Sequence, residues 1–258
     1  MILALLGVLA VAAVVSVLYR GDRGATPTAE APPAAKSPPS VASAPAAPRY
    51  PIVPSPGAQP PLDMSDTTLV AGLEGVIPDA ALSAYLERSN VVRRIVATVD
   101  NIPRRNAPPA LWPVKPAAGG LSTTTQDGRV LIAETNRFRY LPYVKLLESV
   151  NTPRLVELYR RHYPLFEQAY RELGFPAGHF NDRVVEAIDV LMASPSLNEP
   201  PRLVQPKVLY QFADRDLEQL PAGQKLMLRI GPDNEARVKS KLTEIRAAIT
   251  DPALVAGR

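Results

Sequence analysis

An unbroken run of apolar positions occupies residues 2–19. The run reads ILALLGVLAVAAVVSVLY, carries no charge, and contains only two polar side chains, Ser16 and Tyr19. As a helix rising about 1.5 Å per residue it is about 27 Å long, enough to cross a thin bilayer core. We therefore predict an uncleaved transmembrane anchor over residues 1–20, with a cleavable signal peptide as the alternative.

A proline-rich segment follows this run. Residues 24–62 hold 12 of the 29 prolines in the chain, mixed with Ala, Ser and Thr and with few bulky apolar side chains. Proline fixes φ and removes backbone donors, and so little apolar bulk cannot form a core. We expect residues 21–62 to be a disordered linker that holds the remaining chain away from the membrane. As polyproline II, 39 residues span up to about 120 Å.

Apolar positions with helical spacing begin only after Asp63, and they predict one compact, mainly helical domain over residues 63–258. The clearest stripe lies in a helix that Pro103 ends, and it consists of Val91, Val92, Ile95, Val96, Val99 and Ile102. A second stripe lies in a helix that Thr152 should cap and Pro164 should kink: Leu155, Tyr159, Tyr163, Phe166 and Tyr170. Further helices are expected over 65–73, 78–88, 142–149, 181–192 and 222–230, and from 232 onward.

Two stretches within this domain follow the period of a strand instead. The segment LSTTTQDGRVLIA predicts a β-hairpin, because Asp127-Gly128 separates two short runs of strand-forming residues. Residues 202–213 predict one strand that places Val208, Tyr210 and Phe212 on one face, and Pro206 favours an edge position. The expected fold is therefore a helical domain with a small β-hairpin and one edge strand.

Composition and motifs exclude several classes of function. The formal net charge of the chain is +4, but residues 63–258 contribute only +2, which disfavours nucleic-acid binding. Without cysteine, disulfides and thiol catalysis are excluded, and the two histidines cannot form a three-histidine zinc site. No phosphate-binding loop, H-E-x-x-H helix or G-x-S-x-G elbow occurs. We predict no cofactor and no metal ligand.

The strongest candidate for chemistry is a polar cluster at a predicted helix start, made of His179, Asn181, Asp182 and Glu186. A histidine beside a carboxylate can act as a general base, so a hydrolase-like enzyme is one interpretation. The other is structural, because Asn181 or Asp182 is the residue type that caps a helix. We favour the structural account and assign no catalytic residue.

Basic residues predominate between positions 90 and 140. If the fold gathers them beside aromatic side chains, they form a patch suited to anionic lipid headgroups, cell-wall polymer or an acidic protein face. The alternative is an ordinary solvated surface. The candidate patch consists of Arg93, Arg94, Arg104, Arg105, Trp112, Arg137, Phe138 and Arg139.

Five long stretches also carry a family resemblance: IVATVDNIPR (95–104), YLPYVKLLESV (140–150), RHYPLFEQAYRELGFP (161–176), FNDRVVEAID (180–189) and QPKVLYQFADRDLEQLPAGQKLMLRIGPDNEARVKSKL (205–242). They resemble a bacterial family known as domain of unknown function 3014, over most of residues 65–250. The resemblance implies a Gram-negative envelope protein with an N-terminal membrane helix. It implies no activity and no catalytic residue.

Two sequence features disagree about the side of the membrane on which the domain lies. Arg20 and Arg23 follow the apolar run, and by the positive-inside rule they favour a cytoplasmic domain. Long domains often translocate regardless of flanking charge, and a stand-off linker suits the envelope. We expect an inner-membrane protein, anchored through residues 2–19, with its domain in the periplasm and the cytoplasm as the alternative. Its expected role is non-enzymatic binding or scaffolding, with an envelope protein, anionic lipid or wall polymer as partner.

Overall fold

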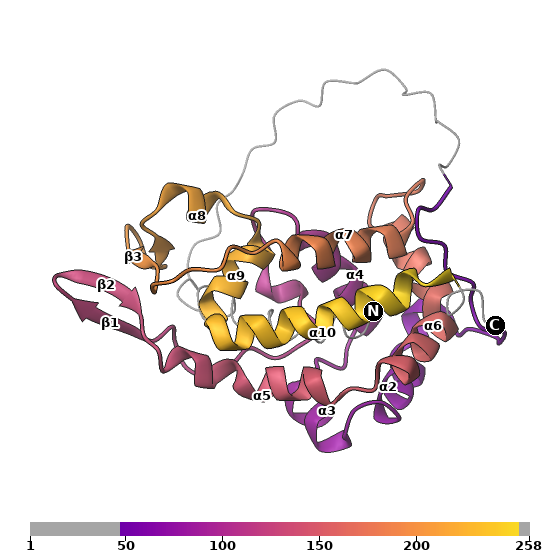
Figure 1. Cartoon of the computed structure of the whole chain (residues 1–258). Coiled ribbons are helices and arrows are strands. Elements are labelled where there is room, and N and C mark those ends of the chain that lie inside the picture. The colour runs from indigo at the N-terminus through magenta and orange to yellow at the C-terminus, as the bar shows by residue number, and fades with distance from the viewer. Residues whose placement is uncertain (1–46, 253–258) are drawn as a thin grey trace, which may run out of the picture.

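The computed structural model describes residues 47–252 (Figure 1). The predicted anchor and most of the predicted linker lie outside this range, which includes only the last 16 linker residues, 47–62. Among the helices inside the range, none combines the length and the apolar character that a membrane crossing needs.

The described part is mainly helical, as the sequence predicts, and carries a small sheet. Residues at helical spacing form α4 (Val91–Asn101), α6 (Thr152–Glu172) and α10 (Pro232–Thr250). The other helices are α2 (Asp66–Glu74), α3 (Asp79–Tyr85), α5 (Asn136–Ser149), α7 (Phe180–Met192), α8 (Arg215–Gln219) and α9 (Ala222–Ile230), with 3-10 turns η1 (Leu62–Met64) and η2 (Pro109–Leu111).

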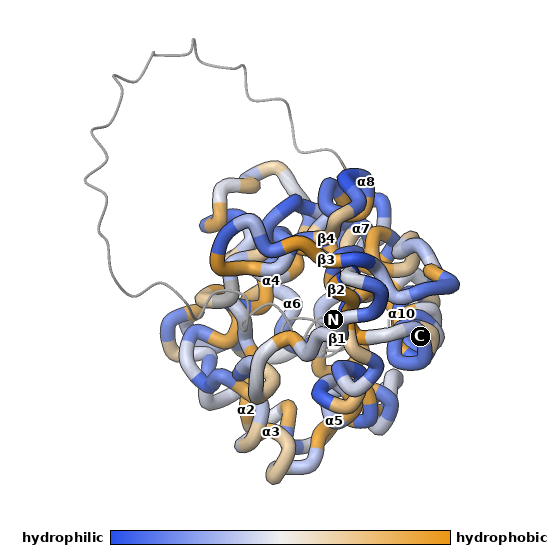
Figure 2. The backbone as a smooth tube through the Cα atoms, turned by 90° about the vertical axis from the view of Figure 1, so that its left-hand side faces the viewer, coloured by the Kyte–Doolittle hydropathy of each residue, from blue (hydrophilic) through white to orange (hydrophobic). Residues whose placement is uncertain are grey.

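The core forms where α4 and α10 meet the other long helices. α4 packs on α6 and α7, while α10 packs on α5, α6, α7 and α9. In Figure 2, hydrophobic and hydrophilic positions are interspersed along the helices. Both predicted stripes are buried, and so is the inward face of α10, made of Val238, Leu242, Ile245 and Ile249. Each such side chain contributes about 1.5–3 kcal/mol when fully buried.

Several helix ends differ from the sequence prediction. α5 begins at Asn136, six residues before Pro142, which lies inside the helix. Proline deletes one backbone hydrogen bond there, and the fully buried Tyr140 and Val144 offset that loss by packing. α6 likewise continues past Pro164. α3 ends at Tyr85, earlier than expected, because the chain becomes extended at the next residue.

The caps of α6 and α7 also lie elsewhere than predicted. Asn151, not Thr152, caps α6, since its side chain accepts a hydrogen bond from the backbone of Arg154 at 3.0 Å. α7 begins at Phe180 with His179 at the cap position, so Asn181 and Asp182 fall inside its first turn. Their side chains are thereby free to bond to other segments of the chain.

The β-hairpin prediction is confirmed, and the single-strand prediction is corrected. β1 (Thr123–Gln126) pairs with β2 (Arg129–Ile132) around Asp127 and Gly128, which adopt the positive φ values that this two-residue turn requires. The stretch 202–213 forms two strands, β3 (Arg202–Val204) and β4 (Gln211–Phe212), in one antiparallel sheet of order β1-β2-β3-β4. Pro206 lies in the turn between them, and Val208 is 65% exposed there.

The end of the predicted linker is packed against the helices. We call residues 47–62 the strap. Its backbone and side chains bond to α6 and α7, and its apolar residues Ile52 and Leu62 are buried. In Figure 1 the strap is the indigo segment beside the ends of these two helices. The packed part of the chain thus extends at least 16 residues ahead of the boundary drawn at Asp63.

Candidate binding groove between α4 and α6

The polar cluster at the start of α7 serves the packing of the strap and of neighbouring helices. Glu167 of α6 lies 3.1 Å from His179 Nδ1, and its other oxygen accepts the backbone N–H of Phe180 at 2.7 Å. The carboxylate of Asp182 accepts two backbone N–H groups of the strap, from Arg49 at 3.0 Å and from Tyr50 at 2.9 Å.

Asn181 is fully buried, and both ends of its amide are used. Its oxygen accepts the hydroxyl of Tyr159 at 3.2 Å, and its nitrogen donates to the carbonyls of Tyr50 and Ile249. Glu186 accepts a hydrogen bond from Arg183 at 2.6 Å. A buried amide satisfied by three segments is what a structural role requires.

The predicted basic patch is divided among several places. Arg93 and Arg94 lie in the first turn of α4, whereas Arg104 and Arg105 lie just beyond its last. Arg94 and Arg104 are ten positions apart, which corresponds to a rise of about 15 Å along a helix. The remaining members are the α5 residues Arg137, Phe138 and Arg139, and Trp112, which is 2% exposed and belongs to the core.

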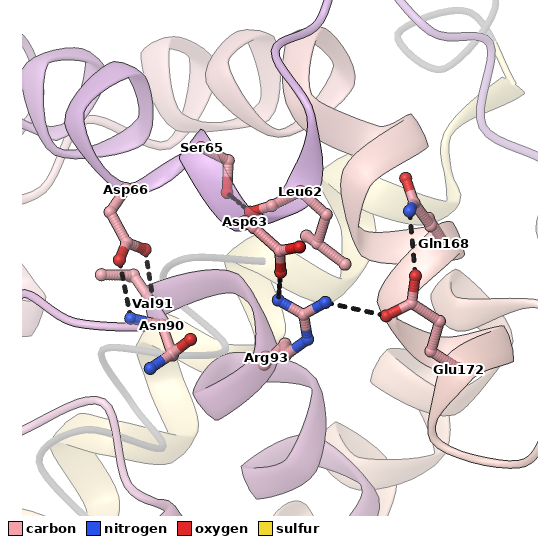
Figure 3. Close-up of polar contacts among 9 residues, drawn as sticks. All are labelled: Leu62, Asp63, Ser65, Asp66, Asn90, Val91, Arg93, Gln168 and Glu172. Atoms are coloured by element: carbon pink, nitrogen blue, oxygen red, sulfur yellow. Dashed lines mark hydrogen bonds and ion pairs between the residues drawn. The ribbon is translucent and has the colours of Figure 1, made fainter.

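Arg93 is held between two carboxylates (Figure 3). Its guanidinium lies 2.6 Å from Asp63 and 3.0 Å from Glu172 of α6. Partial desolvation acts to lower the pKa of Arg93, but the two carboxylates outweigh it and the pKa is raised. Hydrogen bonds from Gln168 and Arg93 lower the pKa of Glu172. The network ties η1, which follows the strap, to α4 and α6.

A second carboxylate from the same region fixes the start of α4. Asp66 of α2 accepts the backbone N–H groups of Asn90 and Val91, both at 2.7 Å (Figure 3). Asn90 precedes the helix with a φ of +53°, and its own side chain makes no cap. Asp66 therefore caps α4 from outside, where a negative charge also complements the helix dipole.

Arg94 fixes the loop that follows α4. It donates to the carbonyls of Ser89, Ala110 and Trp112 at 2.9, 2.6 and 3.1 Å. Within the part of the chain that the structure describes, its guanidinium bonds only to carbonyl oxygens. With Trp112 anchored in the core, these bonds hold η2 beside α4.

These contacts leave a groove between α4 and α6, with a volume of about 400 Å³. Its floor is apolar, because Ala97 and Ala169 keep the two helices free of bulky side chains there. Leu111 and Leu173 flank it, 40% and 44% exposed, and Met64 is exposed next to Asp63. The polar members of the lining are Asn90, Arg93, Arg94 and Glu172. We call this site the α4–α6 groove.

Sequence reasoning identified Arg93 and Arg94 of this groove but not its apolar members. Leu111 and Leu173 stand outside the predicted stripes, in a proline-rich loop and at a helix end. The available signal was the pair of alanines, Ala97 and Ala169, which interrupt the bulky positions of two long helices.

The α5 members of the predicted patch have other partners. Arg137 pairs with Glu134 at 3.1 Å and with Asp233 at 2.9 Å, and its guanidinium carbon lies 4.9 Å from the ring centre of Phe138. Phe138 is 55% exposed. Arg139 donates to the carbonyls at positions 118 and 119 and so fixes the loop before the hairpin.

No group of three or more His, Asp or Glu side chains within residues 47–252 is arranged to hold a metal ion. His162 is buried, and burial lowers its pKa. Its Nδ1 lies 3.2 Å from the amide oxygen of Gln59 in the strap.

Comparison with known proteins agrees with the resemblance seen in the sequence. The model of a family described as protein of unknown function (DUF3014) matches residues 91–246, from the first residue of α4 into α10. Both helices of the groove fall inside the match. No curated protein matches the chain, and no solved structure matches it either.

Proposed function

This chain belongs to the DUF3014 family, whose description names no activity, and from its geometry we propose that it is a non-enzymatic binding or scaffolding protein of the cell envelope. The α4–α6 groove is the observation that carries the proposal. The partner is an envelope protein that places an apolar side chain, with a carboxylate beside it, in this groove.

The apolar floor favours a protein as the partner rather than a charged lipid surface. Two arginines and two carboxylates, counting Asp63 next to Arg93, balance the rim electrically. A balanced rim exerts little long-range attraction on anionic lipid. Exposed leucines around a concave apolar floor suit an apolar anchor side chain of the partner with polar groups around it. Protein interfaces commonly gain most of their affinity from such a buried anchor.

The bonding of Arg94 is the reason for assigning a carboxylate to the partner. Its guanidinium bonds only to carbonyl oxygens within residues 47–252, so no described carboxylate forms an ion pair with it. A partner carboxylate at the rim would complete a charge-assisted hydrogen bond. The bond fixes orientation, while the apolar floor supplies most of the affinity.

The contacts of the 179–186 cluster favour this proposal over the hydrolase-like alternative. An acid–base site needs side chains that can reach a substrate. Asn181 is fully buried, and the carboxylate of Asp182 already binds two N–H groups of the strap. Substrate at Asp182 would have to displace the strap first.

For location, the proposal places the chain at the inner membrane through residues 2–19, with the domain in the periplasm. Residues 20–46 join the anchor to the strap and, in a polyproline II conformation, reach about 84 Å. A domain on such a linker can meet a partner well away from the bilayer surface. The cytoplasm stays the alternative location.

Site-specific crosslinking in cells tests the groove. A photoreactive residue replaces Leu111 or Leu173 in the full chain, and Val208 in the distant β3–β4 turn is the matched exposed control. We expect the same partner adduct from both leucine positions and none from Val208. Adding Leu173→Glu to the Leu111 probe should abolish the adduct. Adducts that survive this change, or that form equally from Val208, contradict the proposal.

A further inference from the structure

Arg229 of α9 is a buried cation, and Glu218, the described acid whose charge raises its pKa, forms no ion pair with it. Arg229 is 5% exposed and forms no ion pair with a carboxylate of residues 47–252. Among the described residues, its Nε has no hydrogen-bond partner, and its Nη1 makes only a long contact of 3.4 Å to the carbonyl of Lys225. Burial lowers the pKa of Arg229. Buried charges in proteins are normally paired, so this one calls for an explanation.

Neighbouring side chains do not supply the missing anion. The guanidinium carbon of Arg229 lies 4.7 Å from the ring centre of Phe212, which offers a cation–π contact only. Glu218 is the nearby acid, but its oxygens are used elsewhere. One accepts the backbone N–H of Phe212 at 2.9 Å, and the other lies 3.3 Å from Lys225 Nζ.

Arg229 lines a cavity of about 140 Å³. Two further cations, Arg105 and Lys225, line it with the single carboxylate of Glu218. Arg105 is exposed and has no hydrogen bond or ion pair with any described residue. Tyr210 and Gln211 add neutral donors to the wall. Three cations against one carboxylate leave a net charge of +2 around a space several times larger than one water needs.

We propose that this cavity binds a phosphate group. Arginine matches phosphate oxygens with two parallel donors, and Arg229 and Arg105 approach the cavity from α9 and from the loop after α4. A phosphate monoester carries about −1.5 to −2 charges at pH 7, which matches the surplus of the lining. This site lies at the opposite end of α4 from the groove and does not depend on the proposed function.

Two sources of phosphate are compatible with the site, and the probes separate them. Inorganic phosphate represents a free dianion. Glycerophosphoglycerol, the soluble headgroup of phosphatidylglycerol, represents a lipid phosphodiester with one negative charge. Each is titrated into the full chain in neutral detergent at constant ionic strength, with chloride as the reference anion. Calorimetry gives the affinity, and thermal unfolding gives the ligand-induced shift in Tm.

Matched arginine variants make the test specific. Arg105→Gln removes one exposed cation of the cavity, and Arg129→Gln removes one exposed cation of the hairpin, so both lower the net charge equally. We expect phosphate to raise Tm saturably in the wild type and in Arg129→Gln. In Arg105→Gln we expect its affinity to fall about tenfold, the cost of a lost charge-assisted contact.

Arg229→Met gives a second test, in which stability without ligand and the response to phosphate should change in opposite directions. The substitution removes an uncompensated buried charge, so Tm without ligand should stay the same or rise while the phosphate-induced shift disappears. Response to the headgroup alone would assign the site to lipid. The proposal is overturned if neither probe raises Tm more than chloride does. It is also overturned if Arg105→Gln and Arg129→Gln lower the affinity for phosphate equally. The comparison of these two variants decides the question even if Arg229→Met does not fold.

Discussion

The backbone N–H of Tyr50 donates to the carboxylate of Asp182 across 2.9 Å, although the two residues are 132 positions apart. The same carboxylate accepts the N–H of Arg49, so a single side chain of α7 fixes the start of the strap. Aspartate in the first turn of a helix ordinarily bonds to its own helix. Here it joins the proline-rich segment to the folded domain, and it gives the first prediction.

Asp182→Ala should lower the free energy of unfolding by about 1–3 kcal/mol, because two backbone donors of the strap lose their acceptor. Asp216→Ala is the control, since Asp216 is an exposed aspartate in the first turn of α8. Urea denaturation of both variants measures the difference. Equal midpoints for the two would mean that the strap is not held through Asp182.

Removal of the whole strap gives the second prediction. A chain covering residues 47–258 should be more stable than one covering 63–258, because the shorter chain loses the buried Ile52 and Leu62. Two buried apolar side chains contribute about 3–6 kcal/mol together when fully removed from water. Urea unfolding at constant temperature measures the difference. If the two chains unfold at the same urea concentration, the boundary at Asp63 is the better one.

Long helices were predictable because their signal is local. The stripe from Val91 to Ile102 repeats at helical spacing within a single short segment, and Gly231 with Pro232 marks the junction of α9 and α10 without reference to any other segment. Burial then confirms what the spacing indicates. The same holds for the hairpin, where Asp127-Gly128 specifies the turn by itself.

Features built from distant segments were not predictable in this way. α4 is capped by Asp66, which belongs to another helix, although Asn90 at its start is itself a residue type that caps helices and makes no such bond here. The strap resembles the rest of the linker in composition, so its contacts with α6 and α7 could not be read from the sequence. The groove needs Leu111 and Leu173 together, which are 62 residues apart and meet only through the packing of α4 on α6.

His162 gives a prediction of pH dependence. Burial, assisted by the charge of Arg161, lowers its pKa below the ordinary 6.5, so the unfolded chain binds a proton there more readily than the folded chain does. The stability that this contributes is fully present above pH 6.5 and is lost as the pH falls through the lower, folded-state pKa. Urea midpoints should therefore decrease between pH 7.5 and pH 5.

His162→Gln should flatten that decrease, because glutamine does not titrate and can still bond to Gln59 of the strap. His179→Gln removes the other histidine of the chain and is the control that should retain the decrease. An unchanged slope in His162→Gln would show that other groups cause the pH dependence.

The last prediction concerns the side of the membrane on which the domain lies. The apolar run at residues 2–19 is followed by Arg20 and Arg23, and these charges alone favour the cytoplasm. The linker favours the envelope, since residues 20–46 would span about 84 Å if they adopted polyproline II and could then serve a partner far from the bilayer. Alkaline phosphatase fused after Arg258 should be active, and a fluorescent protein that matures only in the cytoplasm should stay dark at the same position. If Arg20 and Arg23 decided the orientation instead, the fusions would give the reverse result. Changing both arginines to Gln would then move the domain across the membrane, whereas a periplasmic domain stays where it is after that change.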